Sequence, residues 1–95
     1  MDNRTVYASA AFGRKVKKLK RQDKKELDNA VLDILNDPGI GEEKAGDLAG
    51  VFVHKFKVSR QLILLLYTYD EKEINLLTFG SHENFYRDLK TYRKA

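Results

Sequence analysis

The sequence predicts an α+β domain of the order β-α-α-β-β-β-α, with a helical hairpin packed on a mainly antiparallel four-stranded sheet. In the first part of the chain, apolar residues recur every three or four positions, which is typical of helices. From Val51 onward they alternate with a period of two, which is typical of strands. The length of 95 residues and the hydrophobic content of 42% indicate a single domain, spanning residues 1–95, with its own core.

The N-terminal half is expected to form one short strand and two helices. The strand runs from Arg4 to Ala8, and Ser9 is placed to cap the first helix. After a break near Gln22, Asp23 is the candidate cap of the second helix, and the glycine-rich stretch from Pro38 to Gly50 is predicted to be a loop. The apolar stripes consist of Phe12, Val16 and Leu19 in the first helix and of Leu27, Val31, Ile34 and Leu35 in the second.

The C-terminal half is expected to form a three-stranded meander and a last helix. Ser59-Arg60 turns the chain into the almost continuous apolar strand Gln61 to Tyr69, which we expect to be covered on both faces. A third strand follows at Ile74 to Gly80, and Ser81 can cap the final helix. In the first strand of the meander, alternation places Phe52, His54, Phe56 and Val58 on one face and Val51, Val53, Lys55 and Lys57 on the other.

The composition excludes several classes of site. Because the chain has no cysteine, it has no disulfides, cysteine–zinc sites, thiolate nucleophiles or iron–sulfur clusters. The longest apolar run, Leu62 to Tyr67, is far shorter than the roughly 20 residues that span a bilayer. The N-terminus leads into no hydrophobic signal region. We therefore expect a soluble, cytoplasmic protein without a membrane partner.

Charge is distributed unevenly along the chain. Residues 14–25 hold eight basic residues and one acid, a net charge of +7, whereas residues 26–50 hold seven acids and one lysine, a net charge of −6. Residues 51–69 add three bases and no acid. A basic patch of this kind attracts polyanions, although a solvated helix face would show the same pattern. The charge favours a nucleic-acid partner without establishing one.

Four residues are candidates for chemistry on a phosphodiester. Lys55 and Lys57 project from one strand face, where two ammonium groups can stabilise charge on phosphate oxygens, or can simply protect an edge strand from aggregation. His82 follows the last strand at the start of the last helix, and Tyr86 lies one turn later on the same helix face. His82 could equally be exposed without a role, and Tyr86 could be a packing residue. His54 is expected to be structural, because its strand face is otherwise apolar.

The remaining motifs point away from metals and cofactors. No histidine–carboxylate cluster has the spacing of metal ligands, and neither a nucleophile elbow nor a phosphate-binding glycine loop is present. Cleavage of a phosphodiester would therefore be metal-independent. RNA suits such a site, because its 2′-hydroxyl is an internal nucleophile and the protein needs only an acid, a base and cations.

The chain resembles the RelE/ParE superfamily of toxins from bacterial toxin–antitoxin modules. Nearly the whole chain shares this resemblance, and its most specific part is Gly80-Ser81-His82-Glu83-Asn84-Phe85-Tyr86, which is similar to the ending of YafQ-like and HigB-like members. The resemblance implies a ribosome-dependent mRNA endonuclease in which His82 is the general acid or base and Tyr86 orients the substrate. Lys55 and Lys57 are spaced like the paired strand lysines of RelE.

The chain departs from RelE at one position of the expected site, and the resemblance also implies partners. RelE has an arginine in its third strand where this chain has Leu64, and Arg60 or Arg87 is the candidate replacement. ParE-type members share the fold and inhibit DNA gyrase without being nucleases, which is the alternative function. An antitoxin is expected to mask the basic surface with an amphipathic helix or an added strand. The residues expected to contact mRNA or ribosomal RNA are Arg14, Lys15, Lys17, Lys18, Lys20, Arg21, Arg60 and Arg87.

Overall fold

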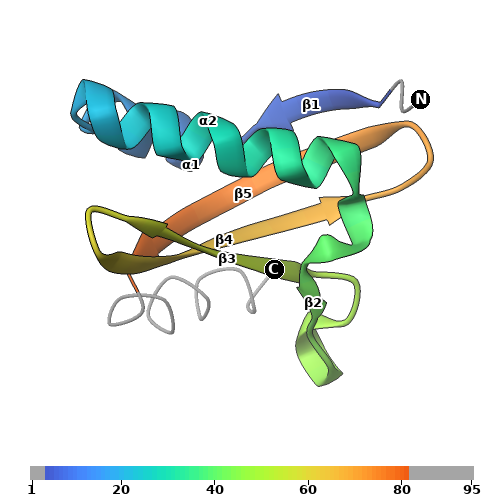
Figure 1. The fold of residues 1–95 in the computed structure, drawn as a ribbon. Helices are drawn as coiled ribbons and strands as arrows, with labels where there is room; N and C mark the ends of the chain where they lie inside the picture. The colour runs from blue at the N-terminus through green and yellow to red at the C-terminus, as the bar shows by residue number, and fades with distance from the viewer. Residues whose placement is uncertain (1–3, 82–95) are drawn as a thin grey trace.

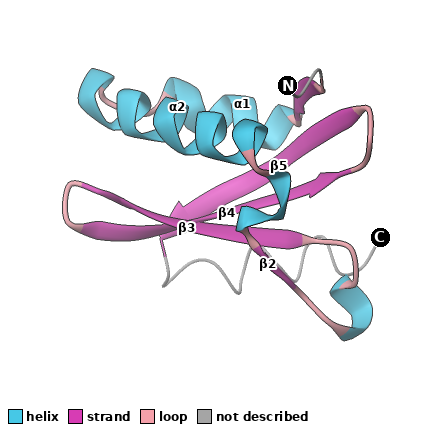
Figure 2. Ribbon diagram, turned by 45° about the vertical axis from the view of Figure 1, so that its right-hand side comes forward, coloured by secondary structure: helices cyan, strands magenta, loops and turns pink. Residues whose placement is uncertain are grey.

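The structure, a computed structural model, describes residues 4–81 of the chain. Its elements are β1 (Thr5–Ala8), α1 (Ala10–Lys17), α2 (Arg21–Asn36), the 3-10 turn η1 (Pro38–Ile40), β2 (Glu42–Glu43), the 3-10 turn η2 (Gly46–Leu48), β3 (Phe52–Val58), β4 (Gln61–Tyr69) and β5 (Glu73–Ser81). The strands form one sheet in the order β1-β5-β4-β3-β2, and α1 and α2 lie together on one of its faces (Figure 1). Turning the molecule shows both helices on the same side of the sheet (Figure 2). The α+β class is therefore confirmed.

The predicted number of strands was wrong, because the sheet formed by residues 4–81 has five strands, although it is mainly antiparallel as predicted. β1 pairs with β5 in parallel, whereas the other three pairs are antiparallel. β2 lies within the segment predicted to be a loop, where Glu42 pairs with Val53 and Glu43 with Phe52. A strand of two residues has no period to recognise, and it forms only because the edge of β3 is there to pair with it. The predicted final helix lies outside the described residues.

The two helix starts differ from each other in their capping. Ser9 caps α1 as predicted, since its Oγ accepts a hydrogen bond from the backbone N–H of Phe12 at 3.0 Å. The predicted cap of α2 was wrong: Lys20 occupies the N-cap, and Asp23 lies inside the first turn. Asp23 instead accepts a hydrogen bond from Ser59 Oγ at 3.0 Å. The break between the helices accordingly falls at residues 18–20, slightly before Gln22.

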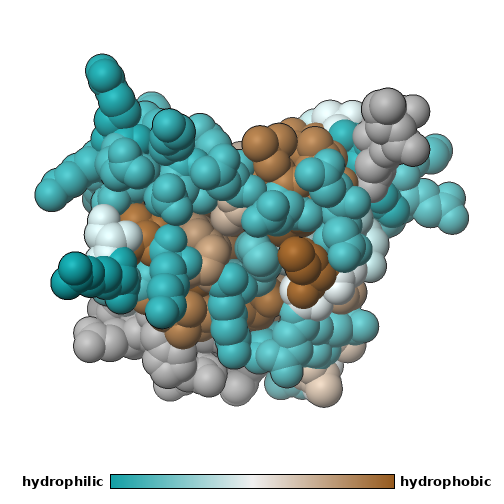
Figure 3. Space-filling view, viewed as in Figure 1, coloured by the Kyte–Doolittle hydropathy of each residue, from teal (hydrophilic) through white to brown (hydrophobic). Residues whose placement is uncertain are grey.

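The core has two parts, one on each face of β4. Ile63, Leu65 and Tyr67 of this strand pack toward the helices, whereas Leu64 and Leu66 pack with Val53 on the opposite face. β4 is thus covered on both faces, as its apolar run predicted. The alternation predicted for β3 is confirmed as well, since Phe52, Phe56 and Val58 join the helix-side cluster and Val53 joins the other. Figure 3 shows polar side chains over the outer surface of α2 and hydrophobic ones between it and the sheet.

Tyr67 connects the sheet to the segment that follows α2. Its side chain is 0% exposed. Its hydroxyl donates a hydrogen bond to the carbonyl of Pro38 at 2.6 Å and accepts one from the N–H of Gly41 at 3.0 Å. A Cβ at Gly41 would lie 2.7 Å from this hydroxyl, so the close approach requires glycine. Burial raises the pKa of Tyr67.

Candidate functional site

Lys55 and Lys57 lie on the face of β3 that is opposite the helices. Both side chains are exposed, and they alternate with the half-buried Phe56, whose ring packs toward the helices. In the register of the sheet, Lys55 pairs with Leu64 and Leu64 pairs with Gly80. Because neighbouring strands are about 4.8 Å apart, the backbones of Lys55 and Gly80 are roughly 10 Å from each other. The lysine pair therefore stands two strands away from the end of β5.

Leu64 separates the lysine pair from β5. It is 3% exposed and packs with Val53 and Leu66 in the core cluster on this face. The position at which the resemblance to RelE predicts an arginine is thus part of an apolar core. Arg60, the first candidate replacement, lies four residues earlier, in the β3–β4 turn, and is exposed. Arg87, the second, lies outside the described residues.

His54 lies on the other face of β3, away from the lysines. Its ring stacks on Phe56 with centroids 6.0 Å apart, and its Nε2 is buried with no hydrogen-bond partner among residues 4–81. Burial lowers the pKa of His54, and the weaker effect of the Asp33 carboxylate raises it. Burial therefore favours the neutral form of this half-buried histidine, which lies on the helix-side face of β3. This placement agrees with the structural role that the sequence predicted.

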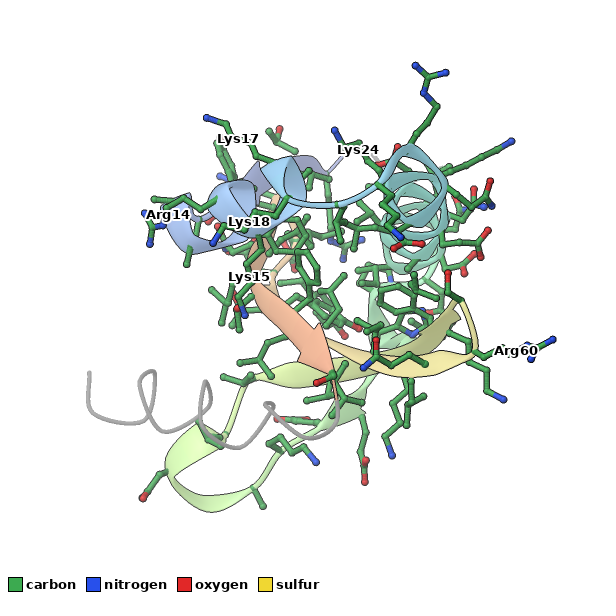
Figure 4. The ribbon with its side chains drawn as sticks, turned by 90° about the vertical axis from the view of Figure 1, so that its left-hand side faces the viewer. Arg14, Lys15, Lys17, Lys18, Lys24 and Arg60 are labelled. Carbon is green, nitrogen blue, oxygen red and sulfur yellow. The ribbon has the colours of Figure 1, made fainter. Side chains whose placement is uncertain are left out.

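One end of the molecule is strongly basic. It is formed by the end of α1, the start of α2, the tip of the β3–β4 hairpin and the end of β5 (Figure 1). Figure 4 looks onto this end and shows Arg14, Lys15 and Lys17 of α1 and the adjoining Lys18 on the left, Lys24 of α2 at the top and Arg60 of the hairpin on the right. Of the predicted RNA-binding residues, the exposed ones are Arg14, Lys17, Lys18, Lys20, Arg21 and Arg60. Lys24, which was not among them, is exposed at the same end.

The hairpin tip that presents Arg60 has an unusual backbone. Ser59 and Arg60 form a two-residue turn with φ values of +50° and +71°, a region that residues with a Cβ adopt at a cost. The hydrogen bond from Ser59 to Asp23 connects this turn to the start of α2. Arg60 and the basic residues of α2 are thereby brought to a common surface.

The basic residues at the start of α2 destabilise that helix. The N-terminal end of a helix is its positive end, so Arg21 and Lys24 oppose the helix dipole, and Asp23 is the acidic residue of the first turn. The basic residues in the last turn of α1, in contrast, favour its dipole. Positive charge placed where it destabilises a helix is typical of a surface that binds an anionic partner.

Lys15 differs from the other basic residues of α1. It is half-buried, and its Nζ donates a hydrogen bond to the carbonyl of Phe79 in β5 at 2.7 Å. Its ammonium group therefore contacts the sheet, whereas the sequence predicted a contact with RNA. The predicted residues His82 and Tyr86 lie outside the described residues. The last described residue before them is Ser81, which pairs with Ile63.

Comparison with known protein families identifies the chain. The family described as the ParE-like toxin of type II bacterial toxin–antitoxin systems matches residues 6–90. The chain belongs to this family. The resemblance to the RelE/ParE superfamily is thus confirmed, and the protein is a toxin of a type II toxin–antitoxin system. Among curated proteins, none matches the sequence of this toxin significantly.

Solved structures of other toxins share the fold of this ParE-like toxin. The toxin–antitoxin complex RelBE2 from Mycobacterium tuberculosis contains a chain that is 20% identical, with a TM-score of 0.71 over 84% of this chain and 99% of that one. A mutant of E. coli toxin RelE in the free state is 16% identical, with a TM-score of 0.70 over 96% and 98% of the two chains. The YoeB dimer from Staphylococcus aureus is 18% identical, with a TM-score of 0.66 over 84% and 98%. At these identities the likeness establishes the fold.

Two further features concern residues 4–81 of the toxin. No helix in this part of the chain is long and apolar enough to cross a membrane. Its histidines and carboxylates form no group of three or more that could hold a metal ion.

Proposed function

We propose that this toxin is an endoribonuclease that cleaves mRNA on the ribosome in the cytoplasm and so inhibits translation. One observation supports the proposal most directly. Lys55 of β3, Leu64 of β4 and Gly80 of β5 are paired across three neighbouring strands, so the exposed lysine pair lies two strands from the end of β5. His82 is two residues beyond Gly80 in the chain. A phosphodiester between the lysines and that segment would meet both cations and a proton-transfer group.

The proposed reaction is an attack of the RNA on itself. The 2′-oxygen attacks the adjacent phosphorus and forms a 2′,3′-cyclic phosphate, and the bond to the 5′-oxygen breaks. His82 carries one of the two proton transfers, either from the 2′-hydroxyl or to the leaving 5′-oxygen, water exchanges the other proton, and Tyr86 orients the substrate. Lys55 and Lys57 stabilise the negative charge that develops on the phosphate oxygens. The reaction as written uses no metal ion.

The basic end of the toxin is the proposed contact with ribosomal RNA. Replacing Lys17, Lys18 and Lys20 with glutamate should weaken co-sedimentation with ribosomes. The loss of affinity should be largest at low salt, because each phosphate contact contributes to the salt dependence of binding and is strongest there. Lys72→Glu, in the β4–β5 turn at the far end of the sheet, is the matched control and should bind like wild type. Undiminished binding by the triple variant at physiological salt would contradict this contact.

An antitoxin is the proposed regulatory partner. Related toxins are seen in complexes with antitoxins, including the RelBE2 complex and the intact E. coli RelBE complex. In this chain the sheet order ends at β1, whose four residues are all exposed, with Tyr7 at 52%. An exposed edge strand with apolar side chains suits an added strand from another chain.

Inhibition of DNA gyrase without RNA cleavage is the second candidate function. Leu64 favours it, because a buried leucine stands where the RelE-type site would have a third cation. The family description also names ParE-like toxins. This function predicts inhibition of supercoiling and indifference to the replacement of His82.

A cell-free translation system distinguishes the two functions. We would add wild-type toxin, His82→Ala or the control Lys72→Met and map the 5′ ends of the mRNA. Wild type and Lys72→Met should generate new ends at A-site codons, whereas His82→Ala should cleave more slowly by a factor of about 10² or more. Intact mRNA with wild-type toxin would refute the nuclease, and a supercoiling assay would then test the gyrase alternative.

A further inference from the structure

The register between β4 and β5 shifts within β5. Leu66 is opposite Thr78, whereas Tyr67 is opposite Leu76, so a β-bulge lies at Leu77. A bulge changes the direction of a strand and of the side chains that follow it. The last residues of β5, which lead into His82, therefore lie beyond a bend in the strand.

The start of α1 contacts this bend. The backbone N–H of Ser9 donates a hydrogen bond to the carbonyl of Leu76 at 3.0 Å, and Ser9 Oγ donates one to the carbonyl of Leu77 at 2.6 Å. The same Oγ accepts a hydrogen bond from the N–H of Phe12, so one hydroxyl both caps the helix and holds the bulge. The helix start and the strand bend are thus connected directly.

Two more residues on the same side of α1 contact β5 further along. The rings of Phe12 and Phe79 meet edge to face with centroids 4.9 Å apart. Lys15 Nζ bonds to the carbonyl of Phe79 at 2.7 Å and lies 6.0 Å from the centroid of its ring. Ser9, Phe12 and Lys15 are three residues apart and share one helix face. We refer to these three residues as the α1 clamp.

We propose that Lys15 is a positioning residue, which acts with the rest of the α1 clamp to fix the C-terminal end of β5 and hence the segment that continues into His82. The inference rests on the proposed function, in which His82 transfers protons. This role distinguishes Lys15 from Lys17, because Lys17 is exposed on the same helix and is suited to contact RNA. One face of α1 is thus assigned to RNA and the other to the described end of β5.

The variant Lys15→Met tests the inference, because it keeps the aliphatic length and removes the ammonium group. Lys15→Arg restores a donor, and Lys17→Met is the matched control on the exposed face. Two measurements are made on each protein: hydrogen exchange of the backbone amides of residues 79–81, and ribosome-dependent cleavage resolved into kcat and KM. In Lys15→Met, we expect these amides to exchange faster and kcat to fall by about tenfold or more, with KM unchanged.

Lys15→Arg should restore the slow exchange and the wild-type kcat. Lys17→Met should raise KM and leave kcat and the exchange unchanged.

Each other result contradicts the inference. Wild-type exchange at residues 79–81 in Lys15→Met would show that Lys15 does not hold the end of β5. A raised KM with unchanged kcat would show that Lys15 itself contacts RNA. If the wild-type toxin fails to cleave, the proposed function is wrong, and hydrogen exchange alone then decides whether the clamp exists.

Discussion

The two faces of β3 differ in what they bury and in what they expose. The face toward α1 and α2 packs against the helices, and even its histidine, His54, is half-buried with its Nε2 fully buried. On the opposite face, Val53 is buried but Lys55 and Lys57, a few residues further on, are exposed. Neighbouring residues of one strand thus have opposite roles, because the period of two sends them into different surroundings. A histidine by itself is a weaker sign of a site than two charges that no element of the described fold covers.

The largest expected effect comes from removing charge on the exposed face. Replacing both Lys55 and Lys57 with methionine should slow cleavage by a factor of about 10² to 10³, which is typical of losing groups that stabilise transition-state charge. The urea midpoint should change little, because the ammonium groups lie in water. Cleavage-end mapping measures the first effect and circular dichroism the second. Wild-type cleavage by the double variant would mean that the exposed face is not the site.

A change on the covered face should affect stability and leave the chemistry intact. Tyr67→Phe removes the hydroxyl that bonds Pro38 and Gly41, so two backbone groups lose their partner, at a cost of about 1–3 kcal/mol in the free energy of unfolding. Urea denaturation measures this loss, and Tyr69→Phe, at the half-buried end of the same strand, is the control. Cleavage per folded molecule should stay the same. Loss of cleavage in a folded Tyr67→Phe protein would show that the two faces are not independent.

The pH dependence of stability sharpens the comparison further. Burial lowers the pKa of His54 in the folded chain, so as the pH falls below the ordinary histidine value of 6.5 the unfolded chain binds the proton first. The stability contributed by neutral His54 is therefore complete above about pH 6.5 and decreases as the pH falls toward the lower folded-state pKa. The urea midpoint of wild type should therefore fall relative to that of His54→Leu as the pH drops through this range, and the difference between the two proteins should be constant above it. A constant difference between the two proteins across this range would refute the assignment.

Much of the fold could be predicted because its signals are local. The strand alternation around Lys55, the doubly covered β4 and the cap at Ser9 each depend on residues within a few positions of one another. The lysine pair of the candidate site was predicted in the same way. Its relation to Gly80 was not, because it depends on the register of two strand pairs. The roles of His82 and Tyr86 stay predictions, since these residues lie outside the described part of the chain.

The sequence by itself determined the class of the fold, the order of its main elements and the face on which each strand residue lies, because helical and strand periods are properties of short segments. The tertiary structure alone decided that β1 is parallel to β5, that β2 exists, that Asp23 bonds Ser59 instead of capping α2, and that Lys15 holds β5. Each of these depends on groups brought together from distant parts of the chain, 64 residues apart for Lys15 and Phe79. No local pattern records such a contact, because it exists only after the helices have packed on the sheet.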